Sequence, residues 1–177
     1  LSSAASDVYK RQSYLLQKGH TNIAVISGPV SSKPGRERLW GYKNALSQAG
    51  VPLNRENIYE GDFSRDSGYE MTCRILERPD RPTAVFSCNN MMTLGCLHAL
   101  RDKGLTVGED IEVLGFDEID DMAEMGARIT CIRRATREMG QVAAEFMLER
   151  LGNNTYASNR RIHLIPELRL GTGGRDR

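Results

Sequence analysis

Four side chains of different chemistry follow consecutive predicted strands of this chain: Arg38, Phe63, Asn89 and Asp117. A guanidinium donates paired hydrogen bonds to vicinal hydroxyls, a carboxylate or a phosphate. An aromatic ring stacks on the apolar face of a sugar or on a base. An amide both donates and accepts, and an ionised carboxylate accepts bonds from two hydroxyls. Together these groups predict recognition of a small polyhydroxylated effector, such as a sugar, a nucleoside or a purine, rather than bond-breaking chemistry.

Each of the four side chains also has a purely structural interpretation. Arg38 could be an ordinary surface arginine, and Phe63 could act as a hydrophobic staple for the helix that follows it. Either Asn89 or Asn90 is expected to cap the next helix. Asp117 could belong to a solvated acidic run. That run consists of Glu118, Asp120, Asp121 and Glu124.

The elements that must position these groups alternate between strand and helix. Short apolar runs predict strands, and longer amphipathic segments, begun by Ser, Pro or Asn and ended by Gly, predict helices. The expected strands cover 23–26, 58–59, 83–86, 111–116 and 129–132, and the expected helices 34–49, 64–77, 91–103 and 135–151. This alternation predicts an α/β fold with a Rossmann-like parallel sheet and helices on both faces. Ligands bind such sheets at the carboxyl ends of the strands.

The last predicted helix carries one apolar stripe at helical spacing. The stripe consists of Met139, Val142, Ala143, Phe146 and Met147. A stripe of this kind is expected to face a core rather than to form a groove for a partner. After this helix, residues 162–170 are expected to be extended, and 171–177 to form a frayed tail.

Composition limits the function classes. The 177 residues suffice for one well-packed domain, and the net charge of +1 provides no basic stripe for duplex DNA. The nearest basic cluster is Arg133, Arg134 and Arg137, which acidic and neutral residues interrupt. The four cysteines lack C-x-x-C spacing and are expected to be buried free thiols, as in a reducing cytoplasm. The three histidines lie far apart, so neither a metal site nor a cofactor is expected, and no apolar run is long enough to cross a membrane.

Several stretches, in this order and spacing, resemble the effector-binding region of the lactose-repressor (LacI/GalR) family of bacterial transcriptional regulators. They are residues 15–20 (LLQKGH), 23–29 (IAVISGP), 38–42 (RLWGY), 82–86 (PTAVF), 113–117 (VLGFD), 129–133 (ITCIR) and 165–168 (IPEL). The resemblance extends from about Ser13 to Thr172. It implies a periplasmic-binding-protein-like fold of type I.

The resemblance also assigns effector contacts. The family's arginine three residues before Gly41 corresponds to Arg38, and its aromatic residue after Gly-Asp corresponds to Phe63. Its asparagine after the strand corresponds to Asn89, and its Gly-Phe/Tyr-Asp carboxylate to Asp117. The sequence departs from the family at two positions near these contacts. Asn90 stands where the family usually has Asp, and Cys131 where Thr is common.

The resemblance further implies an organisation for the chain. Residues 13–133 would form the C-terminal effector-binding subdomain, and 134–177 a return helix, closing strand and tail. Residues 1–12 do not resemble the family and are interpreted as a non-native leader. Neither a helix-turn-helix nor the first pass through the N-terminal subdomain is recognised, so we expect a truncated cytoplasmic regulator. Such a regulator would bind operator DNA through the missing domain and form a homodimer, and the uncovered face of this fragment should favour self-association.

Two other functions fit the same fold class. A periplasmic sugar-binding receptor of a transport system shares the fold, but free cysteines and the closing strand argue against it. A small α/β enzyme would need a nucleophile and a base within reach of each other. No such pair is recognised, so an enzyme is not expected.

Overall fold

The computed structural model describes residues 13–117, 129–152, 162 and 164–171 of the chain. Residues 13–17 are helical. The elements that follow are β1 (Ile23–Ser27), α2 (Lys33–Gln48), the 3-10 helix η1 (Arg55–Asn57), β2 (Ile58–Glu60), α3 (Arg65–Leu76), β3 (Ala84–Ser87), α4 (Asn90–Asp102), β4 (Glu112–Phe116), β5 (Thr130–Arg133), α6 (Thr136–Leu151) and β6 (Glu167–Arg169). The predicted leader, the acidic run and residues 172–177 of the predicted tail lie outside the described residues.

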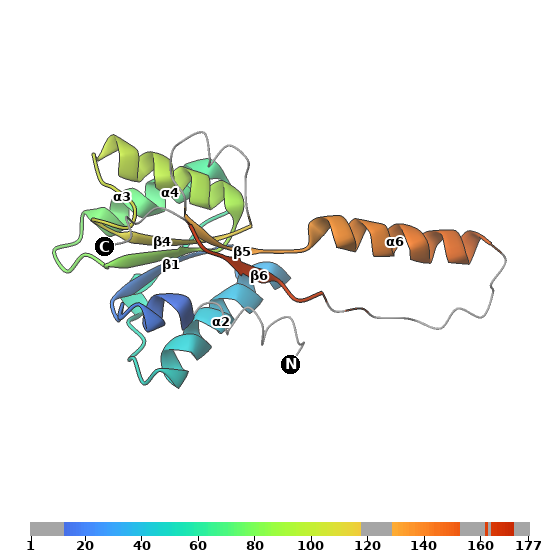
Figure 1. The fold of residues 1–177 in the computed structure, drawn as a ribbon. Helices are drawn as coiled ribbons and strands as arrows, with labels where there is room; N and C mark the ends of the chain where they lie inside the picture. The colour runs from blue at the N-terminus through green and yellow to red at the C-terminus, as the bar shows by residue number, and fades with distance from the viewer. Residues whose placement is uncertain (1–12, 118–128, 153–161, 163, 172–177) are drawn as a thin grey trace.

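The strands form one sheet in the order β2-β1-β3-β4-β5-β6. Strands β1 to β5 pair in parallel, and β6 pairs antiparallel with β5. Helices α3 and α4 cover one face of the sheet and α2 covers the other (Figure 1). The predicted Rossmann-like fold with helices on both faces is therefore confirmed.

The core lies on both faces of the central strands. All residues of β1 and β3 are buried, as continuous apolar runs in parallel sheets require. Phe86 and Leu114 are among the largest completely buried side chains. Cys88, Cys96 and Cys131 are buried free thiols as expected, whereas Cys73 is only half-buried.

Local hydrogen bonds fix the ends of the helices. The Ser32 hydroxyl caps α2 by accepting a bond of 3.1 Å from the Gly35 amide, and the helix begins at Lys33, one residue before the expected start. Gly50 adopts a φ of +68° just after α2, in the left-handed region that glycine occupies without strain. These bonds set where each helix begins and ends, and therefore which side chains stand at the edge of the sheet.

Helices α3 and α4 touch backbone to backbone at two glycines. A Cβ added at Gly95 would lie 1.9 Å from the Arg65 carbonyl oxygen, and one added at Gly68 would lie 2.3 Å from the Met92 oxygen. Neither helix could approach the other this closely with a larger residue at these positions. This contact makes the two helices one rigid layer on the sheet.

Helix α6 differs from the other helices because none of its residues is buried. It projects from the sheet beyond β5 (Figure 1), and only Val142 and Phe146 of its apolar stripe are half-buried. For the described part of the chain, the prediction of a core-facing stripe is therefore wrong. Periodicity locates an apolar face but does not say which element covers it. Within residues 162–170, which were expected to be extended, the structure forms the three-residue strand β6.

Candidate functional site

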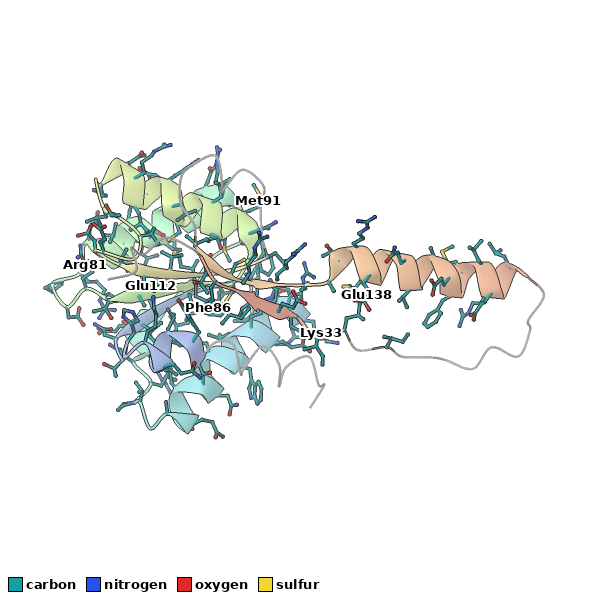
Figure 2. All side chains as sticks on the ribbon, in the orientation of Figure 1. Lys33, Arg81, Phe86, Met91, Glu112 and Glu138 are labelled. Atoms are coloured by element: carbon teal, nitrogen blue, oxygen red, sulfur yellow. The ribbon has the colours of Figure 1, made fainter. Side chains whose placement is uncertain are left out.

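The predicted site residues lie at the edge of the sheet where the parallel strands end. Phe63, Asn89 and Asp117 follow β2, β3 and β4, and Arg38 lies in α2, the helix after β1. Lys33, at the start of α2, marks this edge on the side of α6, whereas Arg81 lies at the opposite end of the sheet (Figure 2). The fold therefore brings the four positions to one edge.

Arg38 reaches from α2 across the strand ends. Its Nη1 donates a hydrogen bond to the Cys88 carbonyl oxygen, and its guanidinium carbon lies 3.7 Å from the centre of the Phe116 ring. Burial lowers the pKa of the Arg38 guanidinium, which stays charged because arginine titrates far above neutrality. Arg38 is thus a held, half-buried cation and not a mobile surface side chain.

Phe63 lies in an unusual backbone conformation, with a φ of +70°. Its ring covers the backbone of Gly28, because a Cβ added there would lie 1.9 Å from Cε1 of Phe63. The staple interpretation fails, since the helical position that a staple would contact is Gly68, which has no side chain. Gly28, which follows β1, leaves the space that this ring occupies.

Asn89 is the N-cap of α4, as one structural interpretation predicted. Its Oδ1 accepts a bond of 2.9 Å from the Met92 amide, and its Nδ2 donates a bond of 3.0 Å to the Phe63 carbonyl oxygen. The side chain thereby joins the start of α4 to the loop that carries Phe63. The Nδ2 group carries two hydrogens, so it can donate a second hydrogen bond besides the one to Phe63.

Asp117 also has a positive φ, +65°, directly after β4. Its amide donates a bond of 2.8 Å to the Ile132 carbonyl oxygen, which joins it to β5. Its carboxylate accepts a bidentate pair from Arg134, with 2.8 Å from Nε to Oδ1 and 2.5 Å from Nη2 to Oδ2. The ion pair raises the pKa of Arg134. Asp117 is therefore an ordered acid with a dedicated cation.

A cleft of about 560 Å³ opens beside these groups, between the start of α2, the ends of β4 and β5, and α6. Its polar end contains Arg38 and Arg134 with Phe116, and its apolar wall comes from the α6 stripe and Leu164. Of the four predicted residues only Arg38 lines the cleft. Asp117 contacts one lining residue, Arg134. Asn89 directly follows Cys88, whose carbonyl oxygen accepts a hydrogen bond from Arg38, and the Asn89 amide donates to the Phe63 carbonyl oxygen.

Phe116 and Arg134 were not recognised from the sequence as site residues. The rule that identified the other residues, a position directly after a parallel strand, also applies to Arg134 after β5. Phe116 is the last residue of a buried strand and looks like any core aromatic. Among the described residues, no three His, Cys, Asp or Glu side chains gather as a metal site would require, and none of the described helices is long and apolar enough to cross a membrane.

Comparisons with known proteins agree with this architecture. The family described as periplasmic binding protein-like domain matches residues 13–172. The chain is 37% identical over 160 residues to the HTH-type transcriptional repressor PurR of Vibrio vulnificus, covering 90% of this chain and 48% of that protein. It is 38% identical to the ribose operon repressor of Escherichia coli, covering 88% of this chain and 47% of that protein. The chain thus spans about half the length of these relatives.

Solved structures give the same result. A regulatory protein of the LacI family from Chloroflexus aggregans superposes with a TM-score of 0.84 at 28% identity, covering 93% of this chain and 59% of that one. The transcriptional regulator CelR in complex with cellobiose gives 0.85 at 30% identity, covering 97% and 52%. The chain therefore belongs to the periplasmic-binding-protein-like domain family, within which it corresponds to the effector-binding region of LacI/GalR regulators.

Proposed function

We propose that this chain binds a small polyhydroxylated effector, a sugar or a nucleoside-like molecule, as part of a DNA-binding transcriptional regulator. One observation carries the proposal. Two arginines and an aromatic ring line a cleft at the carboxyl edge of a parallel sheet, and a carboxylate, Asp117, pairs with one of these arginines. Relatives described as a ribose operon repressor and as a cellobiose complex support a sugar-like ligand.

Each group has a distinct role in this proposal. Arg38 donates from a guanidinium that Phe116 and the Cys88 carbonyl hold in place. Asn89 donates its second amide hydrogen, and Phe63 provides an apolar surface for a sugar or base ring. Asp117 accepts from ligand hydroxyls on the carboxylate lone pairs that Arg134 leaves unused. These groups bind and orient, and none forms a nucleophile–base pair, so the proposed role is binding without turnover.

In the whole regulator, residues 13–133 would form one effector-binding subdomain, and residues from 134 onward would return toward a second one. The effector would shift operator binding only if its affinity differs between two arrangements of these subdomains. The proposal includes a homodimer, because paired operator half-sites need paired DNA-binding domains. Operator contacts would come from a separate domain, since this chain has a net charge of only +1.

The test is titration of the 177-residue chain with ribose, cellobiose, adenosine and hypoxanthine, followed by calorimetry and by NMR of the arginine Nε–H groups. Binding of one probe should be weakened at least about tenfold by Arg38→Lys, which loses the planar guanidinium fork, and by Asp117→Asn, which loses the charge of the acceptor. Arg101→Gln, near the far end of α4, is the matched control and should leave binding unchanged. Equal affinity in all variants would reject the site, and a chemically altered probe would indicate an enzyme.

A further inference from the structure

Arg134 engages both oxygens of the carboxylate that would otherwise receive ligand hydroxyls. Three contacts join the two side chains, from Nε to Oδ1 at 2.8 Å, from Nε to Oδ2 at 3.1 Å and from Nη2 to Oδ2 at 2.5 Å. The Asp117 side chain is only 15% exposed, whereas that of Arg134 is 43% exposed. A neutral hydroxyl that approaches Asp117 must therefore compete with a bidentate guanidinium, which is a stronger donor.

A second guanidinium lies beside the same aromatic ring. The guanidinium carbon of Arg38 lies 3.7 Å from the centre of the Phe116 ring, and that of Arg134 lies 5.9 Å from it. The two cations cannot be farther apart than the sum of these distances. Besides burial, which is the main cause, the positive charge of Arg134 contributes to lowering the pKa of Arg38. Two cations are thus held within interaction range at the polar end of one cleft.

The charge of the residues that line the cleft also favours an anionic ligand group. Among the described residues that line it, Lys33, Arg38 and Arg134 are cationic, and Glu37 is the one anion. Lys33 and Glu37 lie 3.8 Å apart as an exposed pair on α2. Even when Asp117 is counted with Arg134, the described groups leave a net positive charge. An acidic ligand group would therefore meet mainly cationic side chains among the described lining residues.

Two helix N-termini add to this positive field. Helix α2 begins at Lys33 and α6 at Thr136, and both starts adjoin the lining through Lys33 and Ala135. The N-cap residue of α6, Ala135, offers no side-chain hydrogen bond to the first amides of the helix. Helix N-termini carry partial positive charge and bind anions. This field reinforces the two arginines.

We infer that the effector is acidic: a small polyol with a carboxylate or phosphate group that binds between Arg38 and Arg134. This inference rests on the proposed function and narrows its ligand class. The acidic group accepts from both guanidiniums, while the polyol part lies against the apolar wall of the cleft. Arg134 is the specificity-determining residue, because it both recruits the acid and competes with neutral hydroxyls for Asp117.

Substitution of Arg134 should therefore shift the ligand preference from an acidic polyol toward a neutral sugar. Arg134→Gln removes a charge-assisted donor from an acidic ligand and at the same time releases both Asp117 oxygens for hydroxyls. Affinity for an acidic polyol should fall at least about tenfold, and affinity for a neutral sugar should rise. Arg134→Lys retains the charge without the planar fork and should give an intermediate preference.

The experiment is a titration of the 177-residue chain, in buffer free of phosphate and carboxylate, with ribose, ribose 5-phosphate and gluconate. Inorganic phosphate is titrated as well, to measure binding of the anion alone. Wild type, Arg134→Gln, Arg134→Lys and the control Arg101→Gln are compared after thermal unfolding has shown that each is folded. The expected result is a preference of at least about tenfold for ribose 5-phosphate or gluconate over ribose. Which of the two binds distinguishes phosphate from carboxylate.

The outcomes of this titration distinguish a failure of the acidic-effector inference from a failure of the proposed function. A wild-type preference for ribose, an acid preference that survives in Arg134→Gln, or phosphate binding as tightly as ribose 5-phosphate would overturn the acidic-effector inference alone. Absence of binding of every neutral and acidic probe, in wild type and in Arg134→Gln, would overturn the proposed function as well.

Discussion

Helices α4 and α6 have similar lengths and both carry apolar residues, yet they lie in opposite environments. Eight positions of α4, Met92 to Leu97, Ala99 and Leu100, are buried between α3 and the sheet. Helix α6 has no buried residue, and its Leu148 and Leu151 are exposed. The sheet with α2, α3 and α4 forms the body of the structure, whereas α6 is an arm that projects from it. Apolar pattern alone therefore does not determine how much a helix contributes to stability.

The candidate site lies at the junction of body and arm. Arg134 is the first residue after β5, and Ala135 forms an inverse γ-turn with φ −76° and ψ 62°, closed by a bond of 2.9 Å from the Thr136 amide to the Arg134 carbonyl oxygen. The Asp117–Arg134 pair ties this turn to β4. A ligand that binds these side chains is therefore positioned to change how the arm leaves the body.

The largest difference between body and arm should appear on truncation of leucine. Leu114 on β4 is completely buried and Leu148 on α6 is 69% exposed. Leu114→Ala should lower the free energy of unfolding by about 2–5 kcal/mol, through lost burial and a cavity. Leu148→Ala should change it by less than about 0.5 kcal/mol. Urea unfolding measures both, and similar losses would mean that α6 is buried in solution.

A glycine pair should give the next largest effect. A methyl group at Gly95 would meet backbone atoms of α3, as close as 1.9 Å, so Gly95→Ala must push the two helices apart. We expect a loss of about 1–3 kcal/mol. Gly140 on α6 has nothing within 4 Å of the added carbon, so Gly140→Ala should instead gain about 0.5–1 kcal/mol from helix propensity. Thermal unfolding should show shifts of opposite sign; a loss at Gly140 would contradict the separation of body and arm.

Asn89 allows a smaller and more local test at the edge of the body. Asn89→Ala removes the α4 cap and the bond to the Phe63 carbonyl, and should cost about 1–2 kcal/mol. Asn89→Asp keeps the capping oxygen but loses the donor, so stability should be largely retained while the Phe63 loop loosens. Hydrogen exchange at the Ser64 and Met92 amides separates the two roles. Loosening of both sites in Asn89→Asp would argue against this division.

Most of the body could be predicted from sequence because its signals are local. Ser32, Asn89 and Gly50 act within one helical turn, and the apolar runs of β1, β3 and β4 define buried strands wherever they pair. The convergence of Arg38 and Asn89 followed from a topological rule, because parallel strands end at one edge. Their direct link, from Arg38 to the Cys88 carbonyl beside Asn89, required coordinates.

The missed features depend on contacts between strands and on backbone shape. The Asp117–Arg134 pair joins residues 17 positions apart and requires β4 and β5 to be neighbours in register. Phe63 packs on Gly28 with a positive φ, a backbone conformation that nothing in its residue type predicts. The exposure of α6 required knowing what surrounds it. The sequence therefore predicted which edge of the sheet carries the candidate site, whereas the structure was needed to identify Arg134 as the partner of the Asp117 carboxylate.

The smallest expected effect concerns hydrogen bonds within the loop before α3. Hydrogen bonds from Ser64, then from Ser67, lower the pKa of the exposed Asp62 carboxyl to about 2. Because the pKa in the folded state lies below the ordinary value of about 3.9, the ionised carboxylate stabilises the fold above that value. This contribution is lost as pH falls from about 4 to about 2.

The stability difference between wild type and Asp62→Asn, measured by urea unfolding from pH 6 down to pH 2, should therefore be positive at pH 6 and shrink below pH 4. Ser67→Ala removes one hydrogen-bonding partner of the carboxylate and should weaken this pH dependence. A difference that stays constant over the whole range would show that Asp62 ionises equally in the folded and unfolded chains. The loop that presents Phe63 would then be held by the Asn89 amide and not by its own carboxylate.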